Sequence, residues 1–280
     1  MTTPSKIEPP KVGDHIGKYR LIREIGRGGM AMIFEVTDDC SEEHFALKLM
    51  HTDQKAEEVV ERFQQEFDAL SRLKHRNVLR VYESGIHANR PYFVMELLVG
   101  KVLREEVNNW IDIPPTQRFD KTEKILVQIA NALDYIHKQG LVHRDVTPAN
   151  IMILEDGSVK LMDFGVVKIP GMEITIVGEV IGTVAYISPE QIKGEKVDAR
   201  ADLYSLGTAL YLMLTGRRPF SARTLAGYLN RHLNHQPDPP HVFSPMVPKH
   251  LEDACLRLLE KDPKNRFASA NHLLYFLEAQ

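Results

Sequence analysis

Cysteine is scarce in this chain, and long apolar runs are missing from it. Only Cys40 and Cys255 occur among 280 residues, which argues against a disulfide framework and favours a reducing compartment such as the cytoplasm. No apolar run reaches the roughly 18 residues that a membrane-spanning helix needs. The net charge of −3 shows no basic excess, so the composition gives no indication of bulk nucleic-acid binding.

The chain begins with MTTPSKIEPP, which has no hydrophobic stretch of the kind found in signal peptides. We predict a flexible leader over residues 1–15. The hydrophobic content of 43% over 280 residues is enough for a sizeable core in one large domain or two lobes. The chain stops soon after its last predicted helix, as a piece of a longer protein would.

The first third of the chain has the pattern of strands with one helix. A glycine-rich turn at Gly26, Gly28 and Gly29 is either a flexible hairpin tip or a loop whose N–H groups approach a ligand. Lys48 lies within an apolar strand, a costly place for an ammonium unless it meets an anion. Glu66, on the predicted helix, is either an ordinary flanking charge or the partner of that lysine. Strands are predicted at 19–25, 45–49, 75–82 and 91–98, and a helix at 55–73.

From about residue 98 onward, helical periodicity dominates. Ile125, Ile129, Leu133 and Ile136 form one apolar face of a helix that ends at Gly140. Strands with one helix followed by mostly helices predict an α+β fold with two lobes, at 16–97 and 98–280. The predicted helices of the second lobe cover residues 102–110, 119–139, 200–216, 222–234, 248–261 and 268–278.

The stretch from Val142 to Ile153, VHRDVTPANIMI, places polar residues inside an apolar run. Asn150 follows Asp145 by five positions, and Asp163 begins the tripeptide DFG ten residues after Ile153. Carboxylate and amide oxygens are ligands that Mg²⁺ prefers. We hypothesise that Asp145, Asn150 and Asp163 converge on a phosphate ester and its magnesium ion.

With these motifs in order, the chain resembles the eukaryotic-type protein kinase family, and within it the bacterial Ser/Thr kinases. The resemblance covers residues 19–277 and rests on many motifs in the expected order. They are IGRGGMAMIF, FALK, Glu66 on a helix, HRDVTPAN, DFG, SPE, DARADLYSLG and DPKNR. It implies a bilobal kinase fold that transfers the γ-phosphate of ATP to Ser or Thr hydroxyls, with Mg²⁺ or Mn²⁺ as cofactor.

The resemblance also implies a role for each motif residue. Asp145 orients the substrate hydroxyl, and Asn150 and Asp163 bind the metal ions. Lys48 contacts the α- and β-phosphates and is held by Glu66. Asp202 anchors the catalytic loop, and Glu190 pairs with Arg266. The positions implied to contact ATP are Ile25, Gly26, Gly28, Ile33, Ala46, Lys48, Glu66, Met95, Glu96, Leu98 and Met152.

Regulation is implied by the segment from Val166 to Thr183, which resembles an activation loop. Its only hydroxyl-bearing residues are Thr175 and Thr183. We hypothesise autophosphorylation of Thr175 and pairing of its phosphate with Arg144. Thr183 is implied to bond Asp145 and shape the substrate groove. A homodimer for phosphorylation in trans is neither supported nor excluded by the sequence, and the protein substrate cannot be read from it.

Thr147 departs from the family pattern, which has lysine two positions after the catalytic Asp. Loss of one transition-state charge contact can cost about 10²–10³ in rate. Two alternatives therefore stay open: an active Ser/Thr kinase, and a weakly active or inactive nucleotide-binding pseudokinase that acts as a scaffold or allosteric partner.

Three histidines, His232, His235 and His241, have a spacing that invites comparison with zinc sites. No cysteine or carboxylate partner accompanies them. We therefore predict that they belong to a solvated helix face and its adjoining loop.

Overall fold

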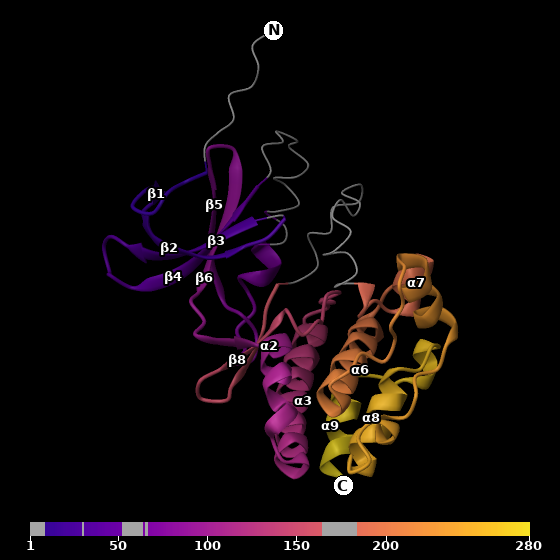
Figure 1. Ribbon diagram of the computed structural model, residues 1–280. Helices are drawn as coiled ribbons and strands as arrows, with labels where there is room; N and C mark the ends of the chain where they lie inside the picture. The colour runs from indigo at the N-terminus through magenta and orange to yellow at the C-terminus, as the bar shows by residue number, and fades with distance from the viewer. Residues whose placement is uncertain (1–8, 30, 52–63, 65–66, 164–183) are drawn as a thin grey trace. The chain divides into compact units, whose positions relative to one another are not determined.

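The computed structural model describes residues 9–29, 31–51, 64, 67–163 and 184–280 (Figure 1). The chain forms two compact units, one of residues 1–74 and 79–98 and the other of residues 75–78 and 99–280. A sheet dominates the first unit and helices dominate the second. The predicted α+β class is confirmed.

The first unit is built on one six-stranded antiparallel sheet with the order β1-β2-β3-β4-β6-β5. Residues 64 and 67–70 are helical and belong to the helix predicted at 55–73. The strands are β1 His15–Ile16, β2 Tyr19–Arg27, β3 Ala31–Asp38, β4 His44–Met50, β5 Val81–His87 and β6 Arg90–Glu96.

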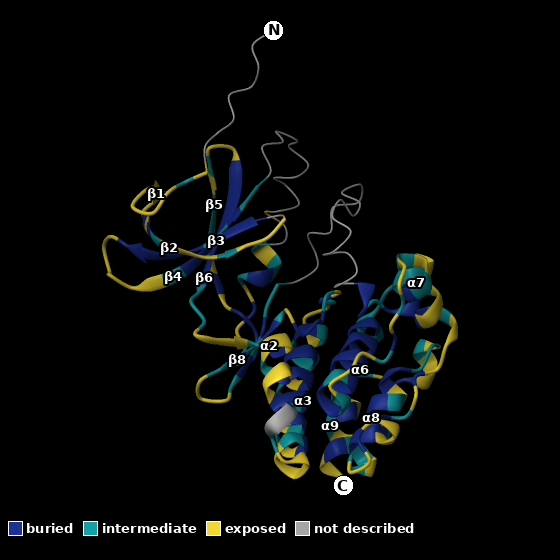
Figure 2. Ribbon diagram, in the orientation of Figure 1, coloured by how far each residue is buried: buried dark blue, intermediate teal, exposed yellow. Residues whose placement is uncertain are grey.

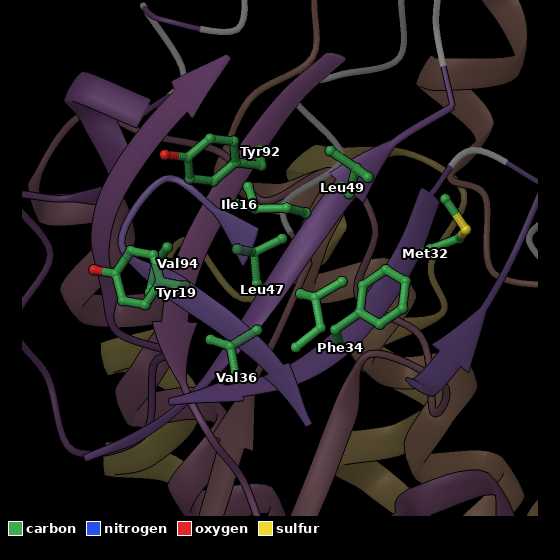
Figure 3. Packing of buried hydrophobic residues seen from close by; sticks show 10 residues of the cluster. Ile16, Tyr19, Met32, Phe34, Val36, Leu47, Leu49, Tyr92 and Val94 are labelled. Carbon is green, nitrogen blue, oxygen red and sulfur yellow. The ribbon is translucent and has the colours of Figure 1, made fainter. Parts of the chain in front are cut away.

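One face of this sheet carries the hydrophobic core of the unit (Figure 3). Side chains alternate between the two faces along a strand, so Phe34 of β3 and Leu47 and Leu49 of β4 share the core face. Each of these three side chains is at most 1% exposed. The register is therefore strongly specified, because a slip by one residue would turn this set toward the other face.

The second unit contains a three-stranded sheet, in the order β7-β8-β9, and most of the helices. No helix in the described ranges combines the length and the apolar character required to cross a membrane. The sheet consists of β7 Gly100–Val102, β8 Ile151–Leu154 and β9 Val159–Leu161. The α-helices are α2 Leu103–Asn108, α3 Pro115–Lys138, α5 Pro189–Lys193, α6 Ala199–Thr215, α7 Leu225–Asn234, α8 Lys249–Leu258 and α9 Ala270–Glu278. Short 3-10 helices are η1 Asn109–Asp112, η3 Pro240–Val242 and η4 Pro263–Asn265.

Helix α6 is buried along most of its length, and Figure 2 shows it largely in dark blue. It begins at the N-cap Asp198, whose side chain accepts from the N–H of Arg200, and ends at Gly216 in the left-handed conformation. Gly207 allows close packing on α8, because a Cβ there would lie 2.7 Å from the Leu258 Cβ. Its interior position makes α6 the framework on which the loops of this unit are fixed.

The strand predicted at 75–82 was wrong over residues 75–80, since β5 begins only at Val81. The side chain of Asn77 instead donates to Gln128 Oε1 at 2.9 Å and to the Val159 carbonyl at 2.8 Å. The ring of His75 stacks on Tyr135, with centroids 5.0 Å apart. These partners, distant in the sequence, hold residues 75–78 in the second unit, so that these residues do not form part of β5.

The predicted solvated histidine face was also wrong for His232, which is fully buried on α7. Its Nδ1 lies 2.9 Å from the Tyr204 hydroxyl, and its ring packs edge-on against Phe220 at 4.9 Å. Burial, together with a smaller effect of the nearby Lys261 ammonium, lowers the pKa of His232 to about 3. The imidazole is therefore neutral in the folded chain at any pH above that range.

Acid is expected to destabilise the second unit through His232. The unfolded chain protonates this residue near its ordinary pKa of about 6.5 and the folded chain does not, so stability present above pH 6.5 is lost as the pH falls. The loss amounts to about 2 kcal/mol at pH 5. Urea unfolding, monitored by the fluorescence of Trp110, the single tryptophan and a buried one, measures this loss of stability. His232→Gln, which does not titrate, should lose correspondingly less stability between pH 7.5 and pH 5, and an equal loss in both proteins would contradict this assignment.

Candidate functional site

One buried carboxylate, on α6, fixes the loop between α3 and β8. Asp202 of α6 is fully buried and accepts from the backbone N–H of His143 at 2.8 Å and of Arg144 at 2.7 Å. His137 Nε2, on α3, lies 2.8 Å from the same carboxylate. The predicted anchoring of this loop by Asp202 is confirmed. Because both carboxylate oxygens are used, the loop backbone is held in one position relative to α6.

Within this loop, the structure brings Asp145 and Asn150 together. The Asn150 side-chain amide donates to the Asp145 carbonyl at 3.0 Å and to its carboxylate Oδ2 at 2.9 Å. The backbone N–H of Asn150 donates to the Thr147 carbonyl at 2.9 Å and closes the intervening turn. A half-buried carboxylate and an amide oxygen thus lie on one rigid turn.

Asp163 follows β9 and is connected to the same turn. The N–H of Met162 donates to the Asn150 carbonyl at 2.8 Å, and the Met162 carbonyl lies 3.0 Å from His143 Nε2. Burial lowers the pKa of His143, so its imidazole is neutral and serves as a packing and hydrogen-bonding group.

Asp163, with φ 45°, and Arg144, with φ 65°, have left-handed backbone conformations that non-glycine residues rarely adopt. Such conformations concentrate at functional sites, where surrounding contacts hold them.

In the first unit, the residues predicted to contact a nucleotide share the sheet face opposite to the core. Ile33 of β3 pairs with Lys48 of β4, and Ala46 pairs with Met95 of β6. Directly opposed residues point to the same face, and Leu47, between Ala46 and Lys48, points to the core. Lys48 is half-buried beside these apolar neighbours. Ile25 and Gly26 lie near the end of β2, where Gly26 pairs with Ile33.

The glycine-rich turn between β2 and β3 has a partner that the sequence did not indicate. The N–H of Gly28 donates to the Ala31 carbonyl at 2.9 Å. His51, directly after β4, places Nε2 at 3.0 Å from the Gly28 carbonyl. The tip of the turn is therefore tied to the strand that carries Lys48.

The remaining predicted contact residues occupy both units. Glu96 ends β6, and its Oε1 accepts from the N–H of Arg80 at 2.7 Å. Leu98 is half-buried at the end of the first unit, and Met152 is half-buried on β8 of the second. Glu66, Thr175 and Thr183 lie outside the described residues, so their predicted roles are not addressed by the structure.

Another group that sequence reasoning missed reaches the loop from α5. Gln191 Nε2 donates to the Arg144 carbonyl at 3.3 Å. Ser188 and Gln191 also form a capping box at the start of α5. The Ser-x-x-Gln spacing is a signature of such a box and could have located this helix start. The predicted pair of Glu190 with Arg266 is confirmed, with N–O distances of 2.7 and 2.9 Å.

Comparison with known proteins decides the family. The family model described as the protein kinase domain matches residues 19–275. The chain belongs to the protein kinase domain family. A probable serine/threonine-protein kinase of Streptomyces coelicolor is 37% identical to this kinase domain over 280 residues, covering 97% of the chain and 41% of the relative. The probable serine/threonine-protein kinase PknB of Bifidobacterium longum is 37% identical over 268 residues, covering 91% of the chain and 38% of the relative.

The fold of the kinase domain is also that of a solved relative. The crystal structure of the Mycobacterium tuberculosis PknI kinase domain matches with a TM-score of 0.75 and 25% identity, covering 97% of this chain and 99% of that one. The kinase domain spans only about 40% of the length of the curated relatives it matches. Family membership implies the use of ATP and a divalent metal ion.

Proposed function

We propose that this kinase domain transfers the γ-phosphate of ATP to serine and threonine hydroxyls of proteins. The observation that carries the proposal is the Asp145–Asn150 pair on a loop held by Asp202. The relatives named as serine/threonine kinases support the choice of acceptor. A chain used only as a scaffold has no need for a carboxylate and an amide held 2.9 Å apart on an anchored turn.

Phosphoryl transfer depends mainly on positioning and on neutralising charge. Asp145 would accept a hydrogen bond from the substrate hydroxyl and direct its oxygen toward the γ-phosphate. Asn150 and Asp163 would hold the metal ion through oxygen donors, which suit Mg²⁺ and Mn²⁺ alike. The metal ion, when held by these residues, would supply positive charge that offsets the negative charge of the phosphates. Lys48 would contact the α- and β-phosphates, with Glu66 as its partner.

The other residues of the sequence-based set keep their proposed roles. The face of the first unit that bears Ile33, Ala46 and Met95 would contact the adenine, together with the backbone near Glu96 and Leu98. Arg144 would pair with phospho-Thr175 after autophosphorylation in trans, which requires a transient homodimer. The two free cysteines suit a cytoplasmic location, where thiols stay reduced.

The threonine at position 147, where the family pattern has lysine, favours a second candidate function, a nucleotide-binding pseudokinase. Its side chain is 6% exposed in the turn between Asp145 and Asn150. We expect Thr147→Lys to raise kcat about tenfold or more, because a cation at this turn stabilises the charge of the transferring phosphoryl group.

The test compares transfer of γ-labelled phosphate by the wild-type chain, Thr147→Lys and Asp145→Asn, with Mg²⁺ and with Mn²⁺. Measurable wild-type transfer that Asp145→Asn abolishes supports the kinase. Nucleotide binding without any wild-type transfer, together with transfer by Thr147→Lys, would instead establish the pseudokinase.

His51 gives a separate prediction about the glycine-rich turn. Removing its hydrogen bond to Gly28 should loosen the turn and raise the KM for ATP about two- to tenfold, with kcat changed less. Steady-state kinetics of His51→Ala measures this effect. His51→Gln, which can still donate, should retain most of the affinity. His15→Ala, at an exposed histidine of the same unit, serves as the control, and an unchanged KM in His51→Ala would refute the role.

A further inference from the structure

Gln191 belongs to a short helix, α5, whose position in the second unit is fixed. Its neighbour Glu190 is 3% exposed and accepts from the buried guanidinium of Arg266 at 2.7 and 2.9 Å. The N-cap residue Ser188 is fully buried, and Gly194 ends the helix in the left-handed conformation. Because the start of α5 and one of its side chains are held by buried contacts, Gln191 reaches its partners from a fixed position.

The orientation of the Gln191 side-chain amide is determined by Ser188. The backbone N–H of Ser188 lies 3.0 Å from one end of the amide, and the Ser188 hydroxyl lies 2.9 Å from the same atom. A backbone N–H can only donate, so this end must be the oxygen Oε1. The other end is therefore Nε2, which can only donate and which lies 3.3 Å from the Arg144 carbonyl. The reverse orientation would oppose two donors at Ser188 and two acceptors at Arg144.

The peptide unit that Gln191 contacts is the one directly before Asp145. Its carbonyl belongs to Arg144, and its N–H belongs to Asp145 and lies 3.3 Å from His143 Nδ1. The N–H of Arg144 itself, in the preceding peptide unit, donates to the Asp202 carboxylate at 2.7 Å. The backbone on both sides of Arg144 is therefore held, and Gln191 supplies the contact to its carbonyl.

The conformation of Arg144 needs such contacts. Its φ of 65° is in the left-handed region, which costs a non-glycine residue energy and persists only where the surroundings hold it. Without the donor of Gln191, the peptide unit between Arg144 and Asp145 is less restrained against rotation. Rotation of this unit would redirect the Asp145 side chain, because the Asp145 Cα is bonded to it. A displacement of about 1 Å at reacting groups can lower a rate about 10²-fold.

We propose that Gln191 is a positioning residue for phosphoryl transfer. Its amide holds the peptide unit between Arg144 and Asp145 in the orientation that directs the Asp145 carboxylate to the substrate hydroxyl. The proposal rests on the proposed kinase function. Because Gln191 acts through this peptide unit and not on the nucleotide, its loss lowers kcat and leaves the KM for ATP unchanged.

Gln191→Glu removes the donor and keeps the cap of α5. A glutamate oxygen still accepts from Ser188, as in the usual capping box, but its second oxygen opposes the Arg144 carbonyl. Steady-state kinetics of the full chain, with γ-labelled ATP and a mixture of serine and threonine peptides, should show kcat about ten- to hundredfold lower. The KM for ATP should stay within about twofold and the Tm within about 2 °C of wild type.

Gln191→Met tests whether the added charge is responsible. Methionine has a similar length and no group that donates to Arg144, so kcat should fall in this variant as well. A fall in the glutamate variant alone would result from its charge and would overturn the proposal.

Ser188→Ala is the matched control, with the opposite expected pattern. It removes the hydroxyl of the capping box, but the backbone N–H of residue 188 still bonds Gln191 Oε1 and leaves Nε2 directed at Arg144. The Tm should fall by about 2–4 °C, with kcat within about twofold of wild type. If kcat instead followed Tm across the three variants, Gln191 would have only a structural role and the proposal would be wrong.

Failure of the kinase function would be recognised separately, as the absence of transfer by the wild-type chain. Hydrogen exchange of the Asp145 amide, measured by NMR, then decides the role of Gln191. Exchange about tenfold or more faster in Gln191→Glu and Gln191→Met, but unchanged in Ser188→Ala, supports the positioning of this peptide unit. Equal exchange in the wild type and all variants refutes it.

Discussion

Replacement of Asp145 by asparagine is expected to lower kcat for phosphoryl transfer about 10³-fold, with ATP bound as tightly as before. An amide oxygen can still accept the 2.9 Å hydrogen bond from Asn150, so the loop geometry is retained. The amide lacks the negative charge that draws the hydroxyl proton away from the attacking oxygen. Initial rates at saturating ATP, with nucleotide affinity measured by calorimetry, give both quantities.

Asp156→Asn provides the matched control for this variant. Asp156 is exposed in the turn between β8 and β9 and bonds only the neighbouring Ser158 among the described residues. Its replacement should leave kcat within about twofold of wild type, as surface substitutions usually do. A less than tenfold loss in Asp145→Asn would contradict the role assigned to the Asp145 carboxylate.

Replacement of Arg266 by methionine is expected to destabilise the second unit by about 3–5 kcal/mol. Arg266 is 2% exposed and donates to both oxygens of Glu190, at 2.7 and 2.9 Å. It also donates to the carbonyls of Arg200, Glu260 and Lys261. The variant leaves the Glu190 carboxylate buried without its counter-charge and removes one donor from each of three carbonyls. The expected result is a fall in Tm of about 10 °C, monitored by Trp110 fluorescence.

Two further variants test the origin of this loss. Arg257→Met removes an exposed arginine that lies over Phe267 at 4.3 Å, and should cost about 1 kcal/mol or less. The double variant Arg266→Met with Glu190→Leu should recover part of the lost stability, because it removes the buried unpaired charge. If Arg266→Met alone were as stable as the wild type, the pair of Arg266 with Glu190 would not be a stabilising contact.

The fold was predictable where the pattern is local and periodic. The helices predicted at 119–139 and 200–216 correspond to α3 Pro115–Lys138 and α6 Ala199–Thr215, because each carries a long run of inward-facing residues. The strand predicted at 75–82 failed because Asn77 is held by partners 51 and 82 residues away. The exposure predicted for His232 failed for the same reason, since its partner Tyr204 lies 28 residues earlier on another helix.

The site was predictable from motif resemblance but not from local chemistry alone. The resemblance placed Asp145 and Asn150 together, and the structure joins them by a hydrogen bond. The approach of His51 to Gly28 and of Gln191 to Arg144 depends on how distant segments pack, which no short motif records.

The most direct test of the central claim is phosphoamino acid analysis of protein substrate and of the chain itself after incubation of the wild-type chain with γ-labelled ATP and Mg²⁺. Phosphoserine or phosphothreonine that is absent from a parallel reaction with Asp145→Asn is the predicted result. Full binding of ATP by the wild-type chain without any labelled hydroxyl amino acid would contradict its assignment as a serine/threonine kinase.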